Sequence, residues 1–140
     1  MTILLTLHSI VRWLTILTAA AALIKLTLGL TQKQAFDKLA SGLTGAFSGL
    51  MDTQLLLGGF FFLLSGAAIP GGFSLRYRWE HLSLMLVAVI LAHLPAMWKK
   101  QADNLRYRNT LFAVLGALIL VALGVSLLPG NRWTRISGLF

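Results

Sequence analysis

Two histidines, an arginine and a glutamate stand inside or at the start of stretches that are otherwise apolar. His8 and Arg12 lie four residues apart and therefore share one face of a helix. Glu80 and His81 open a later apolar run. An ionisable group in mid-membrane costs about 2.5–3.5 kcal/mol on insertion scales, so such groups are candidates for function. One outer polar layer is predicted, made of the candidate cofactor-binding residues His8, Arg12, Glu80 and His81; no catalytic residue is assigned.

Three alternatives fit this outer layer. Two imidazoles from different helices can hold a b-type haem in a bundle core, which makes His8 and His81 the candidate iron ligands. In a structural alternative, Arg12 pairs with Glu80 in a buried cluster that fixes helix register. A quinone headgroup or another small polar ligand is the third. Guanidinium groups suit haem propionates near the interface, and three are available: Arg12, Arg76 and Arg78.

Other metal and hydrolytic sites are less favoured. Glu80 and His81 are adjacent, so on a helix they point about 100° apart and do not converge on one zinc or copper ion. The absence of cysteine excludes disulfides, thiolate metal sites and cysteine-ligated iron–sulfur clusters. A Ser–His–Asp arrangement is not supported, because nothing places Asp52 near the outer histidines.

Asp52 and His93 form a second, inner polar pair. They belong to different apolar runs, and the carboxylate can hold the imidazole or its cation if the two helices adjoin. His81 and His93 are 12 residues apart, a net turn of about 120°, so they cannot serve one compact site. The inner pair is either a packing and hydrogen-bonding pair or a proton relay.

The elements that position these residues are four apolar runs. A spanning helix needs about 20 apolar residues. The chain is 57% hydrophobic and 11% charged, with a mean hydropathy of +0.81, which is more apolar surface than a soluble domain of 140 residues can bury. We predict one all-α domain over 1–140, an integral membrane up-down four-helix bundle with spans at 3–25, 43–69, 78–98 and 110–128. Trp79 and Trp98 bracket the third span at about the hydrocarbon thickness.

Small residues predict how the helices meet. The second span has heptad-spaced short side chains at Gly45, Asp52, Gly59 and Gly66, with Gly49 on the same face. Such a stripe lets another helix backbone approach closely, so we expect it, and Asp52 with it, to face protein. Gly116 and Gly124 predict a looser small face on the fourth span.

Basic residues predict orientation. The first and third connections hold Lys25, Lys33, Lys38, Lys99, Lys100, Arg106 and Arg108. The second connection and the C-terminal tail hold fewer: Arg76, Arg78, Arg132 and Arg135. The positive-inside rule then places both termini outside the inner (cytoplasmic) membrane. The net charge of +8 does not indicate nucleic-acid binding, because the basic residues flank membrane spans.

With these residues laid out, the chain resembles a group of small four-helix bacterial membrane proteins, some of them labelled cytochrome-b-like. The resemblance rests on three segments: His8-Ser9 through Arg12-Trp13, Asp52 through Gly58 (DTQLLLG), and Glu80-His81 with Met85. It implies that the four outer polar residues belong to one site. Some members of the group carry His where this chain has Asp52, which implies that Asp52 is not a required iron ligand.

The leading hypothesis is an integral membrane redox protein or redox-complex subunit. One b-type haem would lie between His8 and His81 near the outer face and exchange electrons with a quinone or a partner protein. The alternative is a non-catalytic accessory subunit of a respiratory or photosynthetic complex, which docks onto other membrane subunits through its glycine and aromatic faces. A small carrier that uses Asp52 and His93 is a third hypothesis, and the lack of a repeat argues mildly against it.

Overall fold

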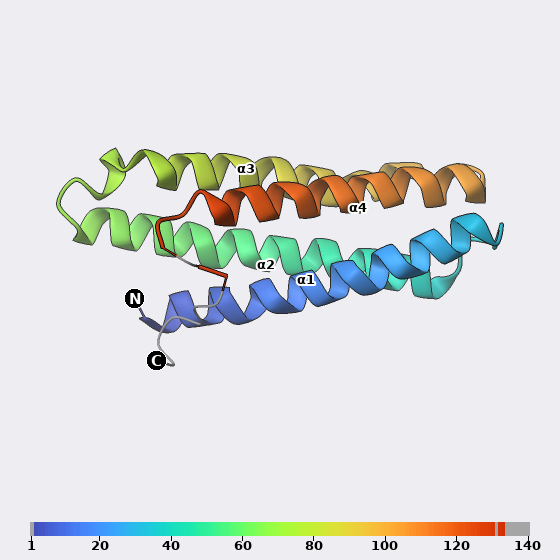
Figure 1. Ribbon diagram of the computed structural model, residues 1–140, viewed down its shortest axis with the longest axis horizontal. Helices are drawn as coiled ribbons and strands as arrows, with labels where there is room; N and C mark the ends of the chain where they lie inside the picture. Colours follow the sequence, from blue (N-terminus) through green and yellow to red (C-terminus); the bar gives the residue numbers. More distant parts are fainter. Residues whose placement is uncertain (1, 131, 134–140) are drawn as a thin grey trace.

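Four long helices form the structure, a computed structural model that describes residues 2–130 and 132–133 (Figure 1). Their bounds are α1 Thr2–Thr31, α2 Lys38–Ala68, α3 Arg76–His93 and α4 Asp103–Ser126. Two short 3-10 helices flank α3: η1 Gly72–Ser74 and η2 Leu94–Trp98. No strand occurs within the described ranges, so the all-α prediction is confirmed.

The four helices are each long and apolar enough to cross a membrane, with α3 and η2 together forming the third candidate span. Several helices extend beyond the predicted apolar spans, because backbone hydrogen bonding continues through polar residues that a hydropathy pattern leaves out. Thus α1 continues to Thr31 and α2 already begins at Lys38. After His93 the third helix tightens to a 3-10 helix, where Pro95 has no N–H to donate.

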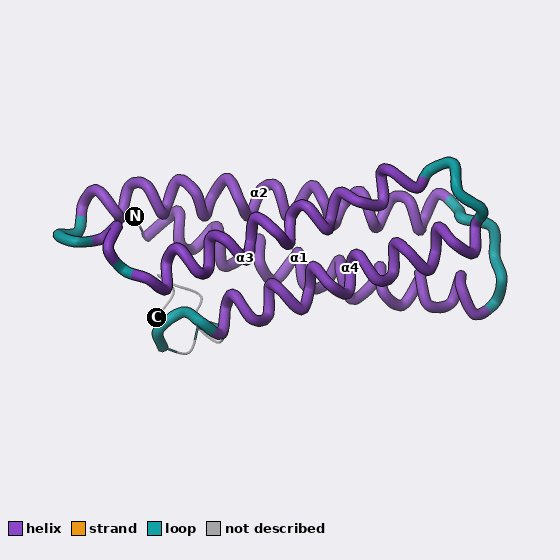
Figure 2. Tube along the Cα trace, turned by 90° about the horizontal axis from the view of Figure 1, so that it is seen from above, coloured by secondary structure: helices purple, strands orange, loops and turns teal. Residues whose placement is uncertain are grey.

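The helices alternate in direction and form a bundle (Figures 1 and 2). Each packs against two others: α1 and α3 both contact α2 and α4. In consequence α1 and α3 occupy opposite corners. The start of α1 and the end of α4 lie at the same end of the bundle (Figure 1).

Alanines dominate the closest helix contacts. Ala19, Ala22, Ala88, Ala92 and Ala117 are all buried. Small side chains let helix backbones approach closely, which is how helices associate when lipid removes the hydrophobic drive between them. Many large apolar side chains instead point outward, among them Leu17, Leu56, Phe60, Ile90 and Phe112. This distribution is the one expected of a bundle surrounded by hydrocarbon.

An ion pair joins the last third of α1 to the end of the α1–α2 connection. Lys25 Nζ lies 2.6 Å from Asp37 Oδ2 and donates to Gln34 Oε1 at 3.0 Å. Asp37 also caps α2, because its carboxylate accepts from the Ala40 N–H at 2.8 Å. The hydrogen bond from Lys25, and then that from Ala40, holds the pKa of Asp37 below its usual value. The cap is therefore stabilised in its ionised form.

Tyr107 fastens the first turns of α4 to the same connection. Its side chain is fully buried, and its hydroxyl donates to the Ala35 carbonyl at 3.1 Å. The ring lies directly against Gly29, where a Cβ would collide with it. A glycine is therefore required at this point of α1 for α4 to approach.

The predicted contact of the α2 glycine stripe with another helix is wrong for Gly45, Gly49 and Gly59. A Cβ built at any of these three positions meets nothing within 4 Å. The reason is the rotation of α2: its bulky residues Phe47 and Met51 face the core, and the glycines lie to the side of them. The fourth-span glycines do pack, since a Cβ at Gly116 or Gly124 would meet side chains of α3.

These two environments predict opposite outcomes for the same substitution. Gly29→Ala should destabilise the bundle by about 1–3 kcal/mol, the usual cost of overpacking, because the methyl group displaces the Tyr107 ring. Gly45→Ala is the matched control, and its stability should stay the same or rise because alanine favours helix. Unfolding of both variants in detergent micelles measures the difference. Equal stability of the two would contradict the close contact at Gly29.

Candidate functional site

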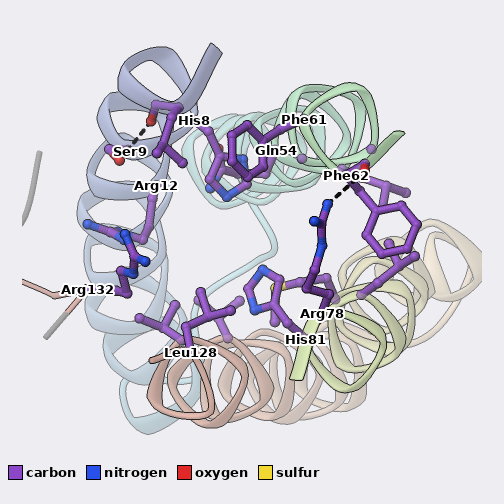
Figure 3. Close-up of a pocket in the computed structure, with 18 of the residues that line it drawn as sticks. His8, Ser9, Arg12, Gln54, Phe61, Phe62, Arg78, His81, Leu128 and Arg132 are labelled. Carbon is purple, nitrogen blue, oxygen red and sulfur yellow. Dashed lines mark hydrogen bonds between the residues drawn. The ribbon is translucent and has the colours of Figure 1, made fainter. Parts of the chain in front are cut away.

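A cavity of about 310 Å³ lies between all four helices, in the half of the bundle where α1 begins and α4 ends. Most of its wall is apolar. The polar side chains that line it include His8, Ser9, Arg12, Gln54, Arg78, His81 and Arg132 (Figure 3). Its volume is at the lower end of the range of pockets that hold small ligands and cofactors.

His81 reaches the cavity from α3 in a defined orientation. Its Nδ1 lies 2.8 Å from the carbonyl oxygen of Gly124 in α4. A carbonyl only accepts, so we assign the ring proton to Nδ1, which leaves the lone pair on Nε2. Histidines that bind metals are commonly held in this way, with one ring N–H on a carbonyl and the other nitrogen facing the ion.

His8 reaches the same cavity from α1, at the opposite corner of the bundle (Figure 3). Its ring packs against α2 at Gly58, where a Cβ would lie 3.1 Å from His8 Cε1. The His8 Nδ1 atom is buried and has no hydrogen-bond partner. The structure thus brings to one cavity the two imidazoles that the sequence pattern singled out. His81 is oriented by a carbonyl, and His8 has one ring nitrogen, Nδ1, without a partner.

Arg12 also lines the cavity, and its side chain lacks an acidic partner. The residue is only 6% exposed, and its Nε and Nη2 atoms have no hydrogen-bond partner. Its guanidinium lies 5.9 Å from the ring centroids of both Trp13 and Trp133. Cation–π contacts compensate only in part for lost hydrogen bonds to a charged group.

Glu80 does not join this site. It pairs with Arg76 one turn earlier on α3, with Arg76 Nε 2.5 Å from Glu80 Oε1, and it does not line the cavity. Neighbouring residues on a helix point about 100° apart, so His81 faces inward and Glu80 does not. The expected Arg12–Glu80 pair is therefore not formed, and Glu80 lies outside the cavity that His8, Arg12 and His81 line.

Arg78 was a candidate only as a propionate partner, but it has a structural role. Its Nη2 atom donates to the Phe62 carbonyl at 2.7 Å and to the Ser65 hydroxyl. Its guanidinium also stacks 5.0 Å from the centroid of the Phe62 ring. Arg78 therefore ties the start of α3 to the last turns of α2 on one wall of the cavity.

Sequence reasoning gave no role to Gln54 in the cavity. Its Oε1 atom is buried there without a partner. The signal was present, since an amide side chain inside an apolar run is as costly as other unpaired polar groups. The sequence does not indicate that Arg132 lines the cavity, because its position depends on how the segment after α4 folds back.

The inner pair lies elsewhere in the bundle. Asp52 Oδ2 is 3.3 Å from His93 Nε2, and His93 Nδ1 is 2.9 Å from the Val89 carbonyl. Both ring nitrogens thus face oxygen atoms, so a proton must lie between Asp52 and His93 for the contact to be favourable. Both side chains are half-exposed, and neither lines the cavity.

No protein family, curated protein or solved structure matches this chain. Among the described residues, no three His, Asp or Glu side chains come together as a metal site. In the candidate site, two imidazoles, a guanidinium with two unpartnered nitrogens and an amide side chain line one mostly apolar cavity.

The Asp52–His93 contact predicts a measurable coupling between α2 and α3. In a cycle of Asp52→Asn, His93→Gln and the double variant, we expect a coupling of about 0.6 kcal/mol and at most 1.7, as for interhelical hydrogen bonds in membranes. Unfolding in micelles supplies the four free energies. Additive effects of the two substitutions would show that the contact does not stabilise the bundle.

Proposed function

We propose that the chain is a multi-pass protein of the inner membrane that binds one b-type haem between His8 and His81 and takes part in electron transfer. The observation that carries the proposal is the convergence of these two histidines, from opposite corners of the bundle, on one cavity. Axial ligation from facing helices is a usual way to hold a cofactor in a bundle core. The chain would act as a redox protein or as a subunit of a redox complex.

Three features of the cavity support a haem as its occupant. His81 is held by the Gly124 carbonyl with Nε2 available, as an iron ligand requires. The position of Gly58 leaves room for the His8 ring against α2. The rest of the wall is largely apolar, with side chains such as Leu82, Met85 and Val125, which suits the faces of a macrocycle.

When bound, a haem supplies one-electron exchange, and the protein tunes it. These surroundings would tune the reduction potential of the haem. An apolar wall disfavours extra charge on the iron, and nearby guanidinium groups favour its reduced form. A quinone or a partner protein would exchange the electron. The distribution of basic residues supports an orientation with both termini outside, which places the cavity in the outer half of the membrane.

An absorption spectrum tests the haem proposal directly. Protein purified from cells supplied with haem precursors should show a Soret band and a reducible α-band. His8→Ala and His81→Ala should each remove the spectrum of a six-coordinate, low-spin iron, because each variant lacks one axial ligand. His93→Ala is the matched control, since His93 lies outside the cavity, and its spectrum should be unchanged.

Two results would overturn the assignment. One is a colourless wild-type protein that also fails to take up added haem. The other is a haem spectrum that is the same in the wild type and in both cavity variants, since the iron would then be bound elsewhere.

A non-catalytic accessory subunit is the second candidate function. It is favoured by one observation: Gly42, Gly45 and Gly49 leave an open strip on the exposed side of α2. Backbones approach closely at such a strip, so a helix of a larger complex is a suitable partner.

This second candidate predicts assembly through α2. In mild detergent the wild type should migrate with other membrane subunits, and Gly45→Leu should release it, because the larger side chain blocks close approach. Gly71→Leu does not serve as a control, because Gly71 has a positive φ of 70°. Leu56→Ala, an exposed change elsewhere on α2, does serve. A wild type that always migrates alone contradicts an obligate subunit.

A further inference from the structure

The cavity contains cationic side chains and no anionic one. Arg12, Arg78 and Arg132 line it. The chain has only four Asp and Glu residues, all in the described part of the structure. None of them lines the cavity: Asp37 pairs with Lys25, Asp52 with His93 and Glu80 with Arg76, and Asp103 lies in the first turn of α4. No acidic side chain is thus available to neutralise these guanidinium groups.

Of these three arginines, Arg12 has the highest cost of burying its charge, because it lies far from either end of α1. It lies ten residues after Thr2, a rise of about 15 Å, and its side chain is more than nine-tenths buried. Side chains on a helix lean toward its N-terminus, so the guanidinium reaches back to about the level of His8. Arginines at such depth normally pair with an acid or with carbonyl groups.

Arg132 adds a second positive charge beside it. The segment after α4 folds back toward α1, so that Arg132 lines the cavity next to Arg12 (Figure 3). Its Nε donates to the Pro129 carbonyl at 2.9 Å. Trp133 also lies over Arg12, and the Arg12 Cζ atom is 5.9 Å from the centroid of the Trp133 ring. Arg12 is buried and Arg132 is partly exposed, so two like charges lie at one end of the cavity, and an anion bound there would reduce their repulsion.

We propose that Arg12 and Arg132 form an anion subsite that binds the carboxylate of an otherwise apolar ligand. Guanidinium binds carboxylate through two parallel N–H donors, and Arg12 offers unpaired donors at Nε and Nη2. The apolar wall receives the rest of the ligand. If the occupant is the haem proposed above, its propionates point toward α1 and the segment after α4, and this part of the inference rests on that proposal.

The other two candidate arginines do not serve this subsite. Arg78 already donates to Phe62 and Ser65. Arg76 is almost fully exposed and pairs with Glu80. Residue spacing left Arg12, Arg76 and Arg78 equivalent as partners of a carboxylate. The contacts in the structure favour Arg12, and Arg132 lies beside it.

The test compares haem with its dimethyl ester, in which both carboxylates are neutral. Full-length protein from haem-depleted cells is titrated with each compound in micelles, and binding is followed by the Soret band. The wild type should bind haem about tenfold or more tightly than the ester, the usual value of a charged hydrogen bond. Arg12→Gln should lose that preference and bind the ester as the wild type does.

Matched variants separate the subsite from general effects of charge. Arg76→Gln removes a positive charge at the same end of the bundle but should keep the full preference for haem. Arg132→Gln should reduce the preference, and it serves as the second variant if Arg12→Gln does not fold. Equal wild-type affinity for haem and ester, or an equal loss of both in Arg12→Gln, would overturn the anion subsite.

A second probe keeps the two proposals distinguishable. If neither haem nor its ester binds, the haem proposal fails, and the subsite is tested with palmitate and methyl palmitate. Palmitate alone should then raise the melting temperature of the wild type but not that of Arg12→Gln. The same response to acid and ester, or no response to either, would overturn the subsite as well.

Discussion

A polar group inside a membrane must find its partners within the protein, and this constraint organises the whole bundle. Hydrocarbon offers no hydrogen bond to a side chain, so every arginine, histidine and amide in a span needs a partner from another helix or from a ligand. Arg78 meets this condition through the end of α2. Arg12 does not: two of its nitrogens are buried without a partner, and the residue lines the cavity. Arg78 therefore has a structural role, whereas Arg12 is a candidate for ligand binding.

The two halves of the bundle are built differently for this reason. In the half near the α1–α2 connection, alanines and Gly29 allow close contact, and Tyr107 and the Lys25–Asp37 pair fasten the helix ends together. In the other half the helices leave a cavity of about 310 Å³. A tightly packed half can hold the helix ends at fixed positions while the opposite half stays open to a ligand. His8 and His81 lie on opposite sides of this cavity (Figure 3).

The topology explains why residues so far apart in sequence meet. His8 and His81 are on the first and third helices, which both run in the same direction and occupy opposite corners. Side chains at similar depth on such helices point toward a common centre. The inner pair is arranged differently: Asp52 and His93 are on adjacent helices and meet at the side of the bundle. Two polar layers with different surroundings result from one simple fold.

The sequence by itself determined four helical elements, the depth order of their polar residues and the candidacy of His8, Arg12 and His81. These features depend on local quantities, namely apolar run length and the 3.6-residue turn of a helix. Only the tertiary structure decided which polar groups have partners. It turned Glu80 toward Arg76, left Gly45, Gly49 and Gly59 of α2 open, and added Gln54 and Arg132 to the cavity. Each of these outcomes depends on the rotation of one helix about its axis or on the path of the chain after α4, and neither is set by residue spacing.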